Sequence, residues 1–227
     1  MPSQEIFILE VSGDFACFTR PEMKVERVSY DLITPSAASA IFEAILWKPA
    51  LSWHVHKIEL LKPIRFLNLR RNEVASVASP KKSHILIEDD RQQRASLLLR
   101  DVAYRLHARF TLKDDSHHQH RYPSCKSPDE GSNSYPKFAE MFKRRAQKGQ
   151  CFHQPYLGTR EFPARFRLIE TGKLAAEAPP LDHSQNLGWM LWGMDYKNPA
   201  DPTALFFNAE LKQGVLDVPA SIKELRQ

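Results

Sequence analysis

The sequence is poor in cysteine and has no long apolar run, and both absences restrict the class of protein. Among its 227 residues are three cysteines, Cys17, Cys125 and Cys151, which are widely spaced and form no Cys-x-x-Cys pair. This odd, scattered set of thiols argues against a structural zinc site and favours a reducing compartment. The longest apolar runs, such as 6–9 and 95–99, are too short to cross a bilayer. The start of the chain lacks the basic and apolar regions of a secretory signal, so we expect a cytoplasmic protein with no membrane partner.

Positive charge is in excess and is clustered. The formal net charge is +5 at pH 7 and the isoelectric point is near 9.1. Residues 57–109 hold twelve Lys and Arg against six Asp and Glu, including basic pairs at 70–71 and 81–82. Such clusters suit a phosphate backbone, because each cation placed near a phosphate releases a condensed counterion. The charge therefore favours a polyanionic partner, although any single basic pair also fits a solvated face.

The first third of the chain predicts a strand, a helix and a further strand or two. Residues 5–11 are apolar and β-branched, and 13–27 has the composition of a loop. Thr34 and Pro35 form a helix start, with Thr34 as the N-cap and Pro35 at the first helical position. A helical apolar stripe follows, which Lys48-Pro49 ends. With strands predicted over 51–66, this order is the opening half of a ferredoxin-like unit.

The remainder predicts one more helix among strands. Residues 68–77 indicate a basic hairpin or loop, and 94–112 a long strand with clean alternation in its latter part. The stretch 113–134 shows no periodicity, and a helix follows from Tyr135 to about Lys148, closed by Gly149. The strands predicted after Phe162 span 164–169, 188–196, 203–211 and 214–218. We expect an α+β protein: a ferredoxin-like (RRM-like) domain over 1–161 and a β-rich C-terminal extension over 162–227.

Two features of the sequence are candidates for a functional site: a group of histidines and a lysine at a predicted helix start. His117, His118 and His120 suggest a metal site, but no cysteine pair or suitably spaced carboxylate completes a ligand set, so we predict neither metal nor cofactor. These histidines fit a polar loop, from which an imidazole could still act as an acid or base. Lys137 lies in the first turn of a predicted helix, where the helix dipole disfavours a cation. A phosphate bound between the helix end and the ammonium would explain it, and a Lys that bends into water would explain it equally well.

Two motifs carry a resemblance to a known family. Residues 150–163 read Gln-Cys-Phe-His-Gln-Pro-Tyr-Leu-Gly-Thr-Arg-Glu-Phe-Pro, and 13–27 read Gly-Asp-Phe-Ala-Cys-Phe-Thr-Arg-Pro-Glu-Met-Lys-Val-Glu-Arg. Together they closely resemble the type I-C CRISPR-associated subunits of the Cas-five family, which belongs to the repeat-associated RNA-binding superfamily of ferredoxin-like folds. The resemblance extends from about 13 to 211. It implies metal-independent cleavage of CRISPR repeat RNA by a protein that stays on the 5′ handle of the guide, together with the other subunits of the surveillance complex.

The resemblance transfers only one of three expected catalytic side chains. In the RNA-cleaving members the second helix starts with Gly-Lys-His, and a Tyr precedes the Trp-Lys-Pro that ends the first helix. Here the Lys is Lys137, the His position holds Phe138 and the Tyr position holds Leu46. We therefore consider three replacements as catalytic candidates: Tyr135, His120 and His153. A shifted alignment around the 113–134 loop is the other explanation.

The RNA implied by the resemblance would need cations for its phosphates and rings for its bases. The candidate phosphate contacts are Arg20, Lys24, Arg27, Arg70, Arg71, Arg144, Arg145 and Arg160. The candidate stacking residues are Tyr156, Phe152 and Phe18. Phe18 and Phe152 also fit a core, Trp189 and Trp192 fit a core or a subunit interface, and Arg160 could pair with Glu161.

Three functional hypotheses follow. The first is an endoribonuclease that processes the CRISPR transcript. The second is a non-catalytic scaffold that binds the guide, which Leu46 and Phe138 favour. The third is a metal-dependent DNA nuclease that uses the histidine loop, and the lack of suitably spaced acidic ligands argues against it.

Overall fold

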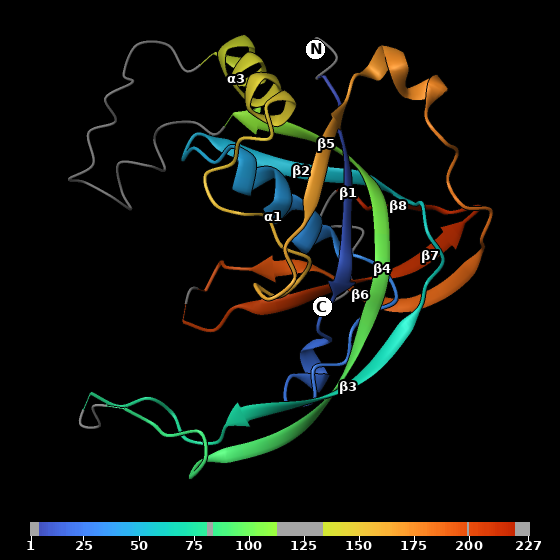
Figure 1. The fold of residues 1–227 in the computed structure, drawn as a ribbon. Coiled ribbons are helices and arrows are strands. Elements are labelled where there is room, and N and C mark those ends of the chain that lie inside the picture. The colour runs from blue at the N-terminus through green and yellow to red at the C-terminus, as the bar shows by residue number, and fades with distance from the viewer. Residues whose placement is uncertain (1–4, 81–83, 113–133, 199, 221–227) are drawn as a thin grey trace.

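The fold is built around one large antiparallel sheet with two α-helices packed on it (Figure 1). The computed structural model describes residues 5–80, 84–112, 134–198 and 200–220. Its helices are α1 (Pro35–Ile45), α3 (Tyr135–Gln147) and the 3₁₀ turns η1 (Pro21–Met23) and η2 (Thr171–Ala176). Its strands are β1 (Phe7–Ala16), β2 (Leu51–Leu60), β3 (Phe66–Val74), β4 (Arg91–Leu112), β5 (Arg165–Ile169), β6 (Gln185–Asp195), β7 (Thr203–Lys212) and β8 (Val215–Asp217).

The strand order joins both ends of the chain in the same sheet. In the described ranges the order is β5-β1-β4-β2-β8-β7-β6, and β3 pairs with β4 outside this path. The central strand β4 lies between β1, where Phe7 faces Ala108, and β2, where Leu51 faces Leu112. The molecule is therefore a mixed α/β protein that is rich in antiparallel strands.

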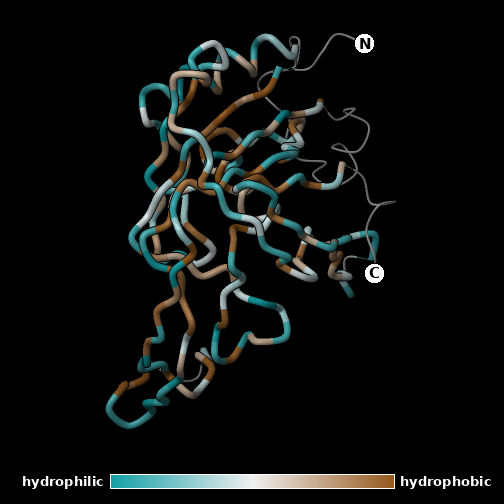
Figure 2. Tube along the Cα trace, turned by 90° about the vertical axis from the view of Figure 1, so that its right-hand side faces the viewer, coloured by the Kyte–Doolittle hydropathy of each residue, from teal (hydrophilic) through white to brown (hydrophobic). Residues whose placement is uncertain are grey.

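A hairpin arm extends from this sheet. The first part of β4 pairs with β3, from Arg91 opposite Val74 to Leu99 opposite Phe66, while its later part enters the central sheet. The arm projects away from the body of the molecule (Figure 1). Figure 2 shows that its tip mixes polar and apolar residues, and Val77 there is 89% exposed. The prediction of a basic hairpin or loop over 68–77 is corrected: most of these residues belong to the single strand β3, which is one side of the arm.

The helices cover one face of the sheet and enclose an aromatic core. Trp53 of β2 lies 5.0 Å from Phe42 of α1 and 4.7 Å from Phe142 of α3, measured between ring centroids. Phe7 and Phe110 complete the cluster. Because Trp53 contacts both helices, α1 and α3 must pack on the same face. Such ring pairs add to the free energy gained from apolar burial.

The opposite face carries buried charge. Glu59 of β2 accepts a bond from Arg105 Nη1 at 2.7 Å, and its other oxygen lies 2.9 Å from His107 Nε2. Arg105 also donates to the carbonyl of Ala178 at 2.9 Å, in the segment after η2. Burial alone would raise the pKa of Glu59, but bonds from His107, Lys57 and Arg105 lower it to about 2. The carboxylate therefore stays ionised inside the protein.

Several predicted elements are confirmed and their boundaries move. Thr34 caps α1, accepting a bond from Ala37 N at 3.3 Å, and Gly149 has φ 64° after α3, as a helix-closing glycine does. The first strand is longer than predicted and reaches Ala16, so the loop predicted from Gly13 begins inside β1. Helix α1 ends at Ile45, before Lys48-Pro49.

The predicted division at 161/162 stays a prediction. β5, which follows it, pairs with β1, and β8 pairs with β2. In the part of the chain that the structure describes, no helix is long and apolar enough to span a membrane. Cys17 is buried and Cys151 half-buried, both as free thiols, whereas Cys125 lies outside the described residues.

Candidate functional site

The start of α3 places Tyr135 and Lys137 at the end of the sheet. The Tyr135 ring stacks on Phe110 of β4 at 4.4 Å, and its hydroxyl donates to the carbonyl of Glu5 at 3.3 Å. Burial raises the pKa of this phenol, chiefly through desolvation. The ammonium of Lys137 lies 5.9 Å from the centroid of the Phe138 ring. A hydroxyl held in this way is a poor base at neutral pH.

The two positions that lack the expected catalytic side chains belong to the hydrophobic core. Leu46 is fully buried and Phe138 is 2% exposed, and both contribute to the same core cluster. The carbonyl of Leu46, at the end of α1, accepts a bond from Trp53 Nε1 at 2.9 Å. Packing therefore explains the apolar residue at both positions.

His153 and Tyr156 line a small cavity of about 330 Å³ that runs along α1, from its N-cap Thr34 to Ala44. Its other walls include Thr34, Ser36 and Ala37 of that helix. A helix N-terminus favours an anion, and Tyr156 offers a ring for stacking. The cavity thus brings together one candidate imidazole and one candidate stacking residue.

The turn that carries this cavity is closely packed against the end of β1. Cys17 N donates to the carbonyl of Leu157 at 3.0 Å, and Leu157 is fully buried. Gly158 has φ 87°, and a Cβ there would lie 2.0 Å from the carbonyl oxygen of Cys17. No other residue fits that position, so the motif around Gly158 serves to hold the turn against β1.

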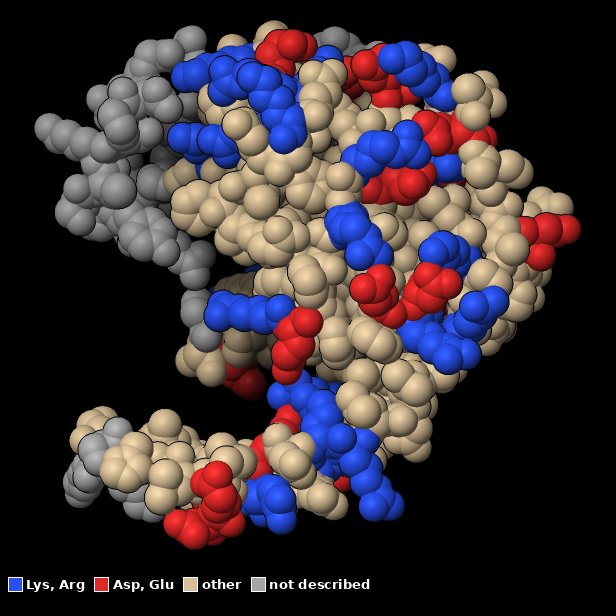
Figure 3. All heavy atoms as spheres, viewed as in Figure 1, with Lys and Arg blue, Asp and Glu red and all other residues tan. Residues whose placement is uncertain are grey.

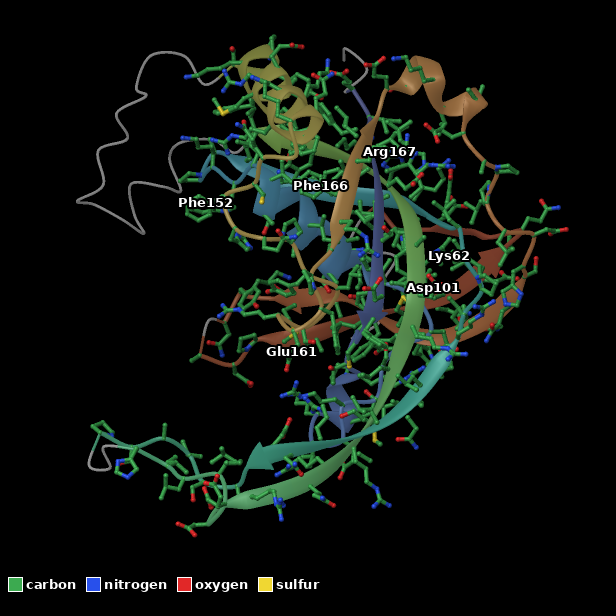
Figure 4. All side chains as sticks on the ribbon, in the orientation of Figure 1. Lys62, Asp101, Phe152, Glu161, Phe166 and Arg167 are labelled. Atoms are coloured by element: carbon green, nitrogen blue, oxygen red, sulfur yellow. The ribbon has the colours of Figure 1, made fainter. Side chains whose placement is uncertain are left out.

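The two phenylalanines considered as stacking candidates, Phe18 and Phe152, differ in exposure. Phe18 is 2% exposed, which confirms it as a core residue. Phe152 is 82% exposed, so the core interpretation of this ring is wrong. Its backbone explains the difference: Phe152 N donates to the carbonyl of Ala44 at 2.8 Å and fixes the loop to α1, while the ring points outward (Figure 4). Phe152 remains a candidate for base stacking.

A second, larger cavity of about 1210 Å³ lies along one edge of β2. The start of α3 forms part of its wall through Tyr135 and Pro136, and Ser36 of α1 lines both cavities. His54, Arg109 and Thr111 contribute polar groups from β2 and β4. The His54 ring lies against Thr111, with 3.1 Å between Nε2 and Oγ1.

Three of the predicted phosphate contacts already have ionic or aromatic partners. Arg27 lies 3.1 Å from Glu73 and 3.0 Å from Glu161, and Arg71 lies 2.7 Å from Glu73. Arg20 lies 3.2 Å from Asp31 and 4.4 Å from the Tyr30 ring. An RNA phosphate would have to compete with these carboxylates, so Arg27 and Arg71 have a structural role as well. Glu161 lies on the side of the body that faces the arm (Figure 4).

The other predicted cations differ in exposure. Arg145 is half-buried and donates to the carbonyl of Ile45 at 3.1 Å, which ties α3 to the end of α1. The four remaining side chains are exposed: Lys24, Arg70, Arg144 and Arg160. Figure 3 shows Lys and Arg gathered at the root of the arm. His120 lies outside the described residues, and within them no group of three or more His, Cys, Asp or Glu could hold a metal ion.

A comparison with protein families identifies the chain. A family described as CRISPR-associated protein (Cas_Cas5) matches residues 6–219. The chain belongs to this Cas5 family. It is 47% identical over 225 residues to the CRISPR pre-crRNA endoribonuclease Cas5d of Mannheimia succiniciproducens, covering 93% of each chain. It is 39% identical over 229 residues to the protein of the same name from Thermus thermophilus, covering 93% of this chain and 90% of that one.

Solved structures share the fold. A structure titled as a CRISPR-associated protein matches with a TM-score of 0.68 and 21% identity over 99% of this chain and 97% of its own. A chain of a CRISPR RNA-guided surveillance complex matches with a TM-score of 0.52 and 12% identity, over 94% of this chain and 88% of its own. At these identities the similarity establishes the Cas5 fold alone.

Sequence reasoning missed the acidic partners and the second cavity. Glu73 and Glu161 lie far apart in sequence from Arg27, so no local pattern indicates the network. The alternation His54–Val55–His56, paired with Arg109–Phe110–Thr111 near the end of β4, does place polar groups on one face. That alternation is the signal that would have drawn attention to His54.

Proposed function

We propose that this Cas5 chain is an endoribonuclease that cleaves precursor CRISPR RNA within the repeat, without metal, and then stays bound to the guide 5′ handle. The observation that carries the proposal is the 47% identity, over 93% of both chains, to a protein named as a CRISPR pre-crRNA endoribonuclease. The Thermus relative with the same name supports it. The basic pairs and exposed cations of the arm fit an RNA partner.

We infer further that the first part of the fold is a ferredoxin-like (RRM-like) unit. The order β1-α1-β2-β4-α3-β5 is the β-α-β-β-α-β order of that unit, with β3 as an added strand. The adjacent strand order β5-β1-β4-β2, with both helices on one face, is consistent with it. This proposal moves the predicted division from 161/162 to a point after β5 (Arg165–Ile169), so that β6 to β8 form the β-rich extension.

The proposed chemistry is an internal transesterification. A general base removes the proton of the 2′-hydroxyl upstream of the scissile bond, and the 2′-oxygen attacks the adjacent phosphorus. Lys137 stabilises the negative charge that develops on the phosphate. The bond to the 5′-oxygen breaks, and the products carry a 2′,3′-cyclic phosphate and a 5′-hydroxyl. Tyr135, His120 and His153 stay candidates for proton transfer.

The partners follow from the same comparison. A neighbour of this fold belongs to a CRISPR RNA-guided surveillance complex. We propose that this chain is likewise a subunit of such a complex, of type I-C, and contacts both the repeat RNA and the other subunits. The resemblance of the 13–27 and 150–163 motifs supports the type I-C assignment.

Cleavage of end-labelled repeat RNA in EDTA tests the proposal, with Lys137→Ala beside the wild type and Lys148→Ala as a matched exposed control. We expect a discrete cut by the wild type, a loss of about 10²–10³-fold for Lys137→Ala, and no change for Lys148→Ala. Tight binding without a cut by the wild type would instead support the second candidate, a guide-binding scaffold. Burial of Leu46 and Phe138 in the core favours that alternative.

A further inference from the structure

We propose that His54 is the general base of this chain and that Arg109 is a cation that binds the scissile phosphate, both acting in the cavity along the edge of β2. The inference rests on the proposed ribonuclease function and specifies which residues replace the side chains absent at Leu46 and Phe138. It moves the proton transfer from the two helices to neighbouring strands of the sheet.

The cavity exists because one edge of β2 is only partly covered. β2 pairs with β4 along its length, but with β8 only from Lys57 to Glu59. One further backbone bond lies next to this pairing, from Val218 N to the carbonyl of His56 at 2.9 Å. The earlier residues of β2, from Ser52 to Val55, line the cavity, whose volume of about 1210 Å³ is large enough for more than one nucleotide.

The start of α3 opens onto the same space. Tyr135 and Pro136 form part of the wall, and Lys137 is the next residue in the helix. Trp192, which is half-buried, adds indole surface on which an unpaired base can stack. The helix start that carries Lys137 and the polar edge of β2 therefore border one cavity.

His54 and Arg109 face each other across the two strands. They are direct partners in the register of β2 and β4, so their side chains project from the same face. Both are exposed. Thr111, two residues on, lies 3.1 Å from His54 Nε2. When Nε2–H donates to the Thr111 hydroxyl, Nδ1 carries the lone pair of the neutral ring, so Thr111 acts as a positioning residue.

The other candidate groups around this cavity are less suitable. Tyr135 donates its hydroxyl to a carbonyl and has a raised pKa. Burial, together with His107, Arg109 and Lys57, lowers the pKa of His56 to about 4, which makes it a weak base at pH 7. His153 lines the other cavity. Among the described residues that line this cavity, His54 is the exposed imidazole, and it lies opposite a cation, Arg109.

His54 takes the proton from the 2′-hydroxyl, and the 2′-oxygen forms a bond to phosphorus. Arg109 stabilises the charge on the non-bridging oxygens. The bond from phosphorus to the 5′-oxygen breaks, the 5′-oxygen takes a proton from water, and His54 returns its proton to solvent.

The test is single-turnover cleavage of repeat RNA in EDTA by the full chain, with binding measured in parallel. We expect His54→Gln to lose about 10²–10⁴-fold in the cleavage rate with unchanged affinity. Arg109→Gln should lose about 10²-fold. Thr111→Val should lose less and should shift the pH profile, which Arg109, His56 and Tyr135 also influence as neighbouring groups. His183→Gln, an imidazole away from the cavity, serves as the control and should leave the rate unchanged.

Chemical rescue separates a catalytic role from a structural one. Free imidazole should restore part of the cleavage rate of His54→Ala, because the open cavity admits it, and should not affect Lys137→Ala. A wild type that cleaves, beside a His54→Gln that cleaves as fast, overturns this inference and leaves the proposed function intact. Loss of cleavage by His54→Ala without rescue, with a lowered melting temperature, also overturns it. No cleavage by the wild type overturns both proposals.

Discussion

The two faces of the central sheet are built from the same strands and differ in chemistry. Toward the helices, β2 and β4 present Trp53 and Phe110 to a cluster of rings. On the opposite face, the same strands present Glu59, Arg105 and His107 to one another. Leu46 and Phe138 belong to the apolar side. The comparison shows that the positions assigned to catalysis by resemblance have become part of the core, while ionisable groups lie across the sheet.

The largest expected loss of stability comes from a change in the aromatic cluster on the helix-facing side of the sheet. Trp53→Ala removes a ring that contacts four others and the donor to the Leu46 carbonyl. We expect it to lower the free energy of unfolding by about 3–5 kcal/mol, measured by chemical denaturation. Trp189→Ala, at a site that is 47% exposed, is the matched control and should cost less than about 1 kcal/mol. Equal losses would mean that the helix-facing cluster does not dominate stability.

Removing a charge from the buried network on the opposite face should lower the free energy of unfolding by nearly as much. Arg105→Ala leaves the Glu59 carboxylate buried with fewer donors, and we expect a loss of about 3–5 kcal/mol in the same assay. Arg167→Ala removes an exposed pair to Glu10 and Glu177 and should cost less than about 1 kcal/mol. If both variants were equally stable, the buried network would contribute no more than a surface pair.

The pH dependence of stability also distinguishes the two faces. His56 has a folded pKa of about 4 against 6.5 in the unfolded chain. As the pH falls from 6.5 to 4, the unfolded chain binds a proton that the folded chain does not, so stability decreases. Glu59, with a folded pKa of about 2, adds a loss between 4.5 and 2.

His56→Gln should remove the first of these losses. Measured as unfolding free energy, the variant should lose about 2 kcal/mol less than the wild type between neutral pH and about pH 4.5. An unchanged slope in that range would mean that His56 takes up a proton in the folded protein. Trp53→Ala should leave the slope unaltered, since it changes no titrating group.

The smallest expected effects come from substitutions in the arm, where two neighbouring arginines differ in exposure and pairing. Arg70 is exposed, whereas Arg71 is paired with Glu73 at 2.7 Å. Arg70→Ala should reduce the salt dependence of RNA binding by about one phosphate contact, a slope change of about 0.7, without changing stability. Arg71→Ala should lower stability by about 1 kcal/mol. Filter binding over a salt series, beside thermal melts, checks both, and the reverse pattern would contradict the assignment.

Local patterns in the sequence were sufficient for much of the fold. The Thr34 cap, the Gly149 helix end and the alternation in 102–112 each depend on neighbouring residues, and the structure has all three features. The arginine network could not be predicted, because Arg27, Glu73 and Glu161 meet only after the strands are paired. The choice between core and stacking for Phe152 could not be made for a similar reason: its sequence neighbours give no indication that its backbone, rather than its ring, makes the tertiary contact.

The candidate site was predictable only in part. Lys137 and Tyr135 follow from the helix start, and the absence of the expected Tyr and His is visible at Leu46 and Phe138. The cavity beside β2 depends on where β8 stops pairing, which no pattern in the sequence reports.

The most direct test of the account is the end chemistry of the RNA products made by the wild-type chain in EDTA. Mass spectrometry of the cleaved repeat should find a 2′,3′-cyclic phosphate on one fragment and a 5′-hydroxyl on the other, and a 2′-deoxy substitution upstream of the cut should abolish both. Fragments with a 3′-hydroxyl and a 5′-phosphate, or a cut that appears only when a divalent cation is added, would contradict it.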